Sequence, residues 1–123
     1  MRIAQLDYPG AKLLMEVNNQ VEETYRVKAC AKEPWTVQFI ESIPPGAVFW
    51  DIGACVGSYA LIAVHCGLTT VAIEPSYPNF GSLCRNLALN GFLDRVLAVG
   101  VALGEKMAWD WFHFQDLRPG AAH

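Results

Sequence analysis

The residues from Val48 to Glu74 constrain the fold of this chain more than any other stretch. An apolar run ends in an acid (VFWDIG), a turn bracketed by glycines follows (GACVG), and an apolar segment leads to a second short run that ends in another acid (VAIEP). Strand, glycine turn, helix and strand in this order are typical of a parallel α/β unit. We therefore predict an α/β fold with a Rossmann-like, doubly wound parallel sheet.

Hydrophobic periodicity and turn residues extend this pattern in both directions. It predicts helices over Trp35–Ser42, Gly57–Cys66 and from Pro78 to Asn90, and strands over Ala47–Trp50, Thr70–Ile73 and Val96–Val101. The run Ala47–Trp50 does not alternate, as expected of a parallel strand that is covered on both faces. The residues Met107–Phe114 alternate and predict a further extended segment, whereas Val17–Val27 fits a strand or a short helix equally well.

The chain is short for this fold. One strand, one helix and two loops take about 27 residues, so a seven-stranded sheet needs roughly 190, and the chain has 123. We expect an N-terminal extension over 1–32 and, over 33–123, the N-terminal half of a domain that is truncated after its third core strand.

Composition indicates a globular protein: 53% of residues are hydrophobic and mean hydropathy is +0.22. The net charge of −3 and the scattered basic residues argue against a nucleic-acid partner. No secretory signal or membrane-spanning run is present, and the four cysteines lack the spacing of a metal site. We expect a cytoplasmic protein with no metal, no membrane contact and reduced, mostly buried thiols.

The glycine turn and the second acid suit a nucleoside-containing cofactor. Gly53 and Gly57 let the backbone approach a ligand that a Cβ would repel, and Ala54 extends this bare surface. Glu74 ends the second strand close to the ~20 residues beyond the glycines at which such folds place the acid that binds both ribose hydroxyls. We predict that these residues contact the cofactor.

Asp51 distinguishes between cofactors. A carboxylate just before the first glycine repels the pyrophosphate of a dinucleotide, and the GxGxxG triple is absent. S-adenosylmethionine carries an ammonium and a sulfonium group and therefore matches this acid better than NAD. An NAD-type oxidoreductase fragment is the less favoured alternative.

The stretches KEPWTVQFIESIPPGAVFWDIGACVGSYALIAVHCG and VAIEPSYPNFGSLCRNLALNGF resemble the FkbM-type family of class I S-adenosylmethionine-dependent methyltransferases, over roughly Glu33 to Leu103. The resemblance implies a class I methyltransferase fold and methylation of a hydroxyl oxygen on a sugar, glycan or natural product. The residues that match the cofactor-binding signatures of the family are Asp51, Gly53, Ala54, Gly57, Glu74 and Pro75. The sequence departs from the family at Cys55, where asparagine is usual.

In the strand order of this family a fourth strand pairs beside the first. The resemblance therefore implies that a chain truncated after its third core strand has an unpaired edge at Val48–Asp51, and we expect self-association through that edge or pairing with another part of a longer protein.

Several residues have a structural interpretation beside the functional one. Pro75 suits loop shaping as well as ligand contact, and Asn86 and Asn90 suit a helix-face hydrogen bond and a helix C-cap. His113 is a weak candidate base, so no catalytic residue is assigned. The aromatic cluster from Trp109 to Phe114 is interpreted as core or as surface that the missing half covers. A non-catalytic cofactor-binding remnant or interaction module is the main alternative function.

Overall fold

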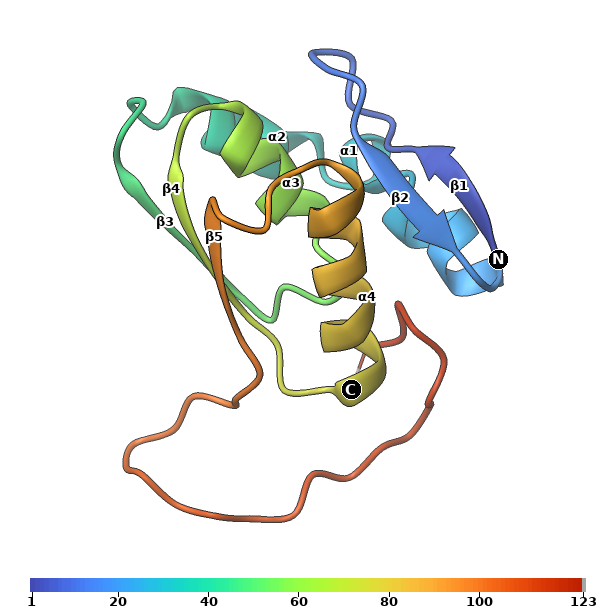
Figure 1. Cartoon of the computed structure of the whole chain (residues 1–123), viewed down its shortest axis with the longest axis vertical. Helices are drawn as coiled ribbons and strands as arrows, with labels where there is room; N and C mark the ends of the chain where they lie inside the picture. Colours follow the sequence, from blue (N-terminus) through green and yellow to red (C-terminus); the bar gives the residue numbers. More distant parts are fainter. Residues whose placement is uncertain (123) are drawn as a thin grey trace.

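The computed structural model describes residues 1–122 and contains a three-stranded parallel sheet in the order β3-β4-β5 (Figure 1). The strands are β3 (Val48–Ile52), β4 (Thr69–Ile73) and β5 (Val96–Val99). The register places Asp51 beside Ala72 and Ala72 beside Ala98. The predicted α/β fold with a parallel sheet is confirmed, with strand ends that differ from the expected ones by at most two residues.

Three helices connect or precede these strands and lie on one side of the sheet (Figure 1). They are α2 (Pro34–Ser42), α3 (Ser58–His65) and α4 (Tyr77–Leu89). Helix α3 is apolar nearly all round and supplies the centre of the core, with Leu61 and Ile62 fully buried. Pro34 and Pro78 stand in the first turns of α2 and α4, where their missing N–H costs no helical hydrogen bond.

The N-terminal segment, predicted as an extension over 1–32, is folded against the sheet domain. It forms an antiparallel hairpin of β1 (Arg2–Gln5) and β2 (Leu14–Val17), a π-helix η1 (Glu22–Arg26) and the short helix α1 (Ala29–Lys32). Met15 is fully buried in the same core as the residues of α3. Of the strand and the short helix that the sequence allowed for Val17–Val27, the structure contains a helix. The domain boundary at residue 32 stays a prediction.

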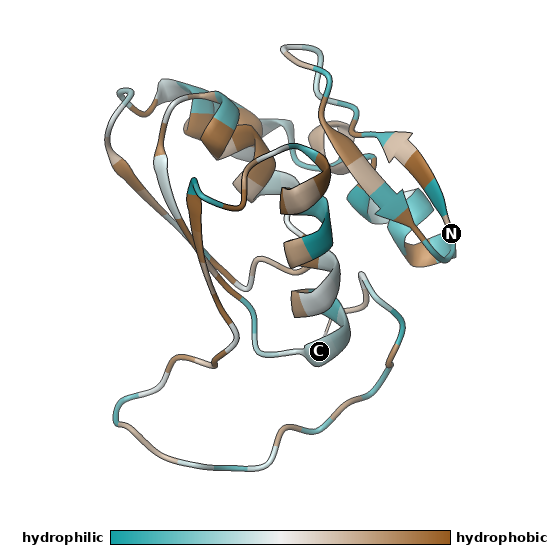
Figure 2. Ribbon diagram, in the orientation of Figure 1, coloured by the Kyte–Doolittle hydropathy of each residue, from teal (hydrophilic) through white to brown (hydrophobic). Residues whose placement is uncertain are grey.

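The opposite face of the sheet is bare in the part of the chain that the structure describes. Val48, Trp50 and Leu97 are 55%, 57% and 63% exposed, and Figure 2 shows β3 and β5 as hydrophobic strands. The expectation that the first strand is covered on both faces is therefore wrong. Apolar side chains on that face reflect a sheet suited to two covering layers, of which residues 1–122 supply one.

Residues 100–122 follow β5 without regular secondary structure and return towards the N-terminal end of α4 (Figure 1). The extended element predicted over Met107–Phe114 forms no strand, and Trp109 is 102% exposed. Alternating side chains alone do not make a strand, because each backbone group also needs a partner in a neighbouring strand. The interpretation of the aromatic cluster as core is therefore wrong for Trp109 and Trp111, which are both exposed.

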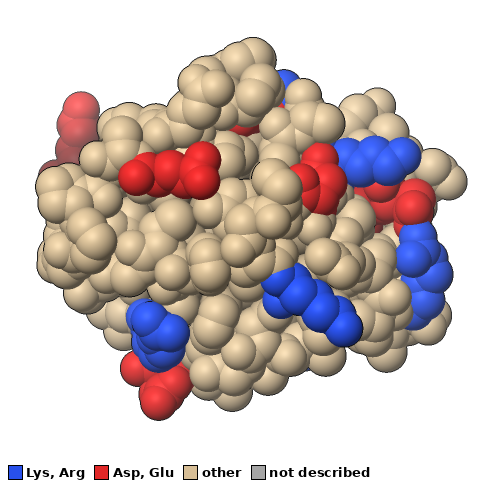
Figure 3. All heavy atoms as spheres, turned by 90° about the horizontal axis from the view of Figure 1, so that it is seen from above, with Lys and Arg blue, Asp and Glu red and all other residues tan. Residues whose placement is uncertain are grey.

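Surface charge is mixed. On the face seen in Figure 3, Lys and Arg side chains are interspersed with Asp and Glu. None of the helices formed by residues 1–122 combines the length and the apolar character that crossing a bilayer requires. All four cysteines are free thiols, but only Cys30 is buried, so the expectation that most of them are buried is wrong.

Candidate functional site

The turn that follows β3 exposes a stretch of bare backbone. Gly53 has a φ of +77°, and its backbone N–H and that of Ala54 both donate to the carbonyl of Ile73 at 2.9 Å. These two hydrogen bonds fix the turn against the end of β4. A Cβ added at Gly53 would meet no atom within 4 Å, so it would project into open space. Gly53 thus keeps clear the space that a ligand can occupy.

Cys55 stands in the same turn in a left-handed conformation, with a φ of +54°. It is the one residue other than glycine with a positive φ among residues 1–122. Asparagine tolerates this region better than most residues because its short polar side chain bonds to the local backbone. The left-handed backbone therefore gives a physical reason why asparagine would suit this position.

Glu74 lies at the carboxyl end of β4 with its carboxylate held by two backbone donors. Oε1 accepts from the N–H of Cys55 and Oε2 from the N–H of Ser76, both at 2.8 Å. The side chain is 5% exposed. Since each carboxylate oxygen has a second lone pair, the two oxygens stay available side by side for a pair of hydroxyl donors. The loop geometry therefore orients this acid before any ligand arrives.

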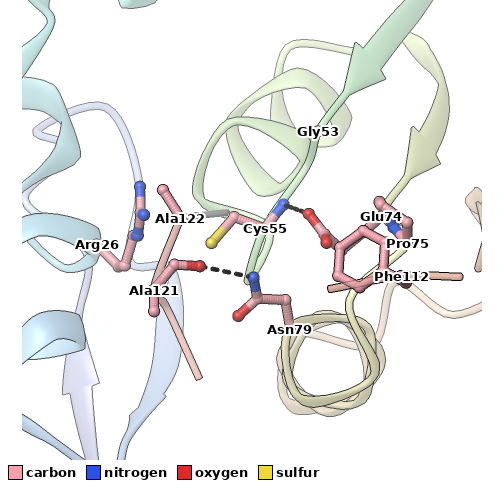
Figure 4. Close-up of a pocket in the computed structure, with 9 residues that line it drawn as sticks. All are labelled: Arg26, Gly53, Cys55, Glu74, Pro75, Asn79, Phe112, Ala121 and Ala122. Atoms are coloured by element: carbon pink, nitrogen blue, oxygen red, sulfur yellow. Dashed lines mark hydrogen bonds between the residues drawn. The ribbon is translucent and has the colours of Figure 1, made fainter. Parts of the chain in front are cut away.

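A cavity of about 280 Å³ opens in front of this carboxylate (Figure 4). Of the predicted site residues, the structure brings Gly53, Glu74 and Pro75 together on its wall. Ala54 lines a smaller adjoining cavity of about 50 Å³ with Gly53 and Cys55. The full set of residues that line the larger cavity is Arg26, Gly53, Cys55, Glu74, Pro75, Asn79, Phe112, Ala121 and Ala122.

Asp51 is not on the wall of this cavity. It is 9% exposed, between the sheet and α3, and its carboxylate accepts a hydrogen bond from the backbone N–H of Ala60. Oδ2 is buried and has no hydrogen-bond partner among residues 1–122. Burial raises the pKa of Asp51 to about 6; the Ala60 hydrogen bond opposes this rise and the charge of Glu74 adds to it. Asp51 and Glu74 are thus close enough to the glycine turn and to each other for their negative charges to repel.

Gly57 also lies off the cavity wall and has a packing role. It is the N-cap of α3 with a φ of +98°, and a Cβ there would lie 2.7 Å from Cδ1 of Leu83. This contact brings the start of α3 against α4, so glycine is required whatever the ligand. Its predicted contact with the cofactor, like that of Asp51, stays a prediction.

Asn86 and Asn90 hold the N-terminal hairpin. Asn86 accepts from the N–H of Glu16 and donates to the carbonyl of Val56, both at 2.8 Å. Asn90 is the C-cap of α4 and bonds to both the N–H and the carbonyl of Leu14 at 2.8 Å. Asn90 also donates to the carbonyl of Asn86 at 2.8 Å within α4. Both are therefore the structural residues that the sequence suggested, and they also bond to β2 and the glycine turn.

Sequence reasoning missed three parts of the cavity wall: Arg26 of η1, Asn79 of α4 and the C-terminal residues Ala121 and Ala122. The spacing of Asn79, Asn86 and Asn90 carried a usable signal, because residues seven and four apart share one face of a helix. No such signal marked Arg26, which is one cation in a polar segment. His113 is exposed and lies off the cavity wall, and the described residues that line the cavity include no histidine or lysine.

No protein-family model matches the chain, and no curated protein matches it in sequence. Among solved structures, the SAM-dependent methyltransferase from Agrobacterium tumefaciens is similar in fold, with a TM-score of 0.59 and 14% sequence identity. The match covers 80% of this chain and 32% of that one. The fold is that of a Rossmann-like methyltransferase. At this identity the likeness extends to the fold alone, and the chain spans about a third of that neighbour.

Proposed function

We propose that this chain is the cofactor-binding half of an S-adenosylmethionine-dependent methyltransferase. The observation that carries the proposal is the Glu74 carboxylate, held by two backbone N–H groups at the carboxyl end of β4 and facing a cavity beside the bare Gly53 turn. Ligands of open α/β sheets bind at the carboxyl ends of the strands, and an acid at the end of the second strand binds the ribose hydroxyls. The fold of the neighbour adds support.

The residues present fit this cofactor on three counts. Gly53 leaves space where any side chain would project, and Glu74 offers two acceptor oxygens side by side. Asp51 and Glu74 place two acids near the turn, and Oδ2 of Asp51 lacks a partner among the described residues. Two acids favour a ligand with positive charge over a pyrophosphate. S-adenosylmethionine, when bound, supplies a methyl group on a positively charged sulfur.

The acceptor that we propose is a hydroxyl on a sugar, glycan or natural product, and the family is the FkbM type. Both rest on the resemblance of the motifs around Asp51 and Glu74. We place the reaction in the cytoplasm, for which the four free thiols are the supporting observation. Methyl transfer to oxygen mainly requires alignment of the acceptor with the methyl group, and it usually also requires a base for the hydroxyl proton.

The test is calorimetric titration of the full chain with S-adenosylhomocysteine, the demethylated product. Glu74→Gln keeps the shape of the side chain but replaces one acceptor oxygen by a donor. Because a hydrogen bond to a charged group is worth about 1.5–3 kcal/mol, we expect an affinity loss of about 10- to 150-fold. Glu105→Gln is the matched control, since Glu105 is an exposed acid away from the cavity and should bind as the parent does.

Two results would overturn the proposal: no heat of binding for the parent, or equal affinities for the parent and Glu74→Gln. Tighter binding of NAD than of S-adenosylhomocysteine would favour the oxidoreductase alternative. Binding without methyl transfer to a panel of hydroxyl acceptors would favour a cofactor-binding remnant.

A further inference from the structure

The C-terminal residues Pro119–Ala122, called the strap below, are fixed across the cavity by side chains from two distant elements. Asn79 of α4 accepts from the N–H of Gly120 at 2.8 Å and donates to the carbonyl of Ala121 at 2.9 Å. Arg26 of η1 donates through Nε to the carbonyl of Gly120 at 2.7 Å. Asn19, which precedes η1, donates to the carbonyl of Pro119 at 2.9 Å.

These bonds are well placed to hold the strap. Asn79 is 2% exposed and Ala121 is 6% exposed, so water competes little for their hydrogen bonds. Asn79 uses both halves of its amide on the strap backbone, as Asn90 does on the backbone of Leu14. The strap is therefore bound by the same kind of two-sided amide hydrogen bonding that attaches the N-terminal hairpin to α4.

Gly120 allows the strap to come this close. Its φ is +87°, and a Cβ there would lie 2.8 Å from Cγ of Glu22 and 3.3 Å from Cγ of Arg26. Both the left-handed backbone and the contact with η1 therefore require glycine. Gly120 is not one of the residues that line the cavity, so a substitution there acts on the cavity only through the position of the strap.

The docked strap forms a wall of the cavity and does not fill it. Ala121 and Ala122 line the space together with Glu74 and Phe112 (Figure 4), and about 280 Å³ stays open with the strap in place. That volume is close to the lower end of the 300–1,000 Å³ typical of ligand cavities. The two alanines form this wall with little side-chain bulk.

We propose that the strap is a wall of the cofactor site, that Asn79 and Arg26 are its positioning residues, and that strap docking and cofactor binding strengthen each other. The inference rests on the proposed function, because the ligand is the same cofactor. By linkage, a ligand that binds better when the strap is docked must stabilise the docked strap by the same factor. The N-terminal segment, through Arg26 and Asn19, is then part of the binding site.

The test combines S-adenosylhomocysteine titration with hydrogen exchange of the strap amides in the full chain. Asn79→Ala removes two hydrogen bonds, and Gly120→Ala introduces the clash with η1. Both variants should lose protection of the strap amides and bind at least about tenfold more weakly. Asn79→Asp keeps the acceptor for the N–H of Gly120, so its losses of strap protection and of affinity should be smaller. Gly104→Ala is the control, because its Cβ would meet only one atom, at 4.0 Å.

In the parent, saturating S-adenosylhomocysteine should slow the hydrogen exchange of the strap amides. The factor should equal the factor by which the affinity falls when the strap is undocked. The proposal would be overturned if the variants lost protection of the strap amides but bound S-adenosylhomocysteine as tightly as the parent. Tighter binding by the variants would also overturn it, because the strap would then obstruct the site. Unchanged strap protection in both variants would refute the assigned contacts. A parent that binds no S-adenosylhomocysteine would remove the proposed function and this inference together, whereas a parent that binds and variants that bind equally would remove this inference alone.

Discussion

Replacing Asp51 by asparagine should change how the stability of this chain depends on pH. Burial holds the pKa of Asp51 at about 6 in the folded chain, against an ordinary value of 3.8. One pKa unit corresponds to 1.36 kcal/mol, so this difference of about two units makes the ionised Asp51 cost about 3 kcal/mol of folding free energy at pH 7. One oxygen of this carboxylate, Oδ2, is buried without a partner among the described residues, which adds to the cost of the charge.

The sign of the effect follows from proton binding. Between about pH 4 and pH 6 the folded chain holds the Asp51 proton while the unfolded chain has released it. The free energy of unfolding therefore falls as the pH rises through this window and levels off above about pH 7. Burial also raises the pKa of Glu22, which adds a slope of the same sign. The difference between the parent and Asp51→Asn isolates the contribution of Asp51.

Urea unfolding followed by circular dichroism at pH 4.5, 6 and 7.5 measures this difference. Relative to the parent, Asp51→Asn should gain about 2 kcal/mol between pH 4.5 and pH 7.5, because about 1 kcal/mol of the cost is already present at pH 4.5, above the ordinary pKa of 3.8. Asp110→Asn, the same change at an exposed residue, should follow the parent throughout. A constant difference between Asp51→Asn and the parent across the three pH values would show that the carboxyl group is not titrating in this range, and the reasoning would fail.

Two shorter predictions concern the turn and the bare face of the sheet. Cys55→Asn should raise the free energy of unfolding by up to ~1 kcal/mol in urea unfolding, because asparagine tolerates the φ of +54° better; a loss of stability would show that the thiol packs in a way that outweighs the backbone strain. We also propose that the chain self-associates through the edge of β3 and its exposed face. Trp50→Glu should then shift sedimentation towards the monomer without lowering the melting temperature, and a parent that is monomeric at every concentration would refute the association.

The parts that local sequence signals govern were predicted closely. The strand predicted over Ala47–Trp50 is Val48–Ile52 in the structure, and the helix predicted over Gly57–Cys66 is Ser58–His65. Apolar runs, a glycine turn and a glycine stop are properties of neighbouring residues, so they can be read without knowledge of the fold. The end of β4 places Glu74 at the cavity for the same reason.

The parts that depend on distant partners were not predicted. The aromatic alternation of Met107–Phe114 suggested a strand, but no neighbouring backbone pairs with it in residues 1–122. The sequence did not indicate that Asp51 is buried and off the cavity wall, and its predicted contact with the cofactor stays a prediction. In a parallel strand, successive side chains point to opposite faces, so the sheet pairing decides which acid reaches a cavity.

One face of α4 links the fold to the candidate site. Asn79, Asn86 and Asn90 each use a side-chain amide on the backbone of a different segment: the strap, the glycine turn with β2, and the start of β2. An amide can donate and accept at once, so it satisfies backbone groups that have no strand or helix partner. Asn79 is in the first turns of α4, and Glu74 follows β4 just before this helix, so the helix that anchors the N-terminal hairpin also carries part of the cavity wall. A change that loosens the hairpin from α4 can therefore reach the cavity by two routes, through α4 to Asn79 and through the N-terminal segment to Arg26.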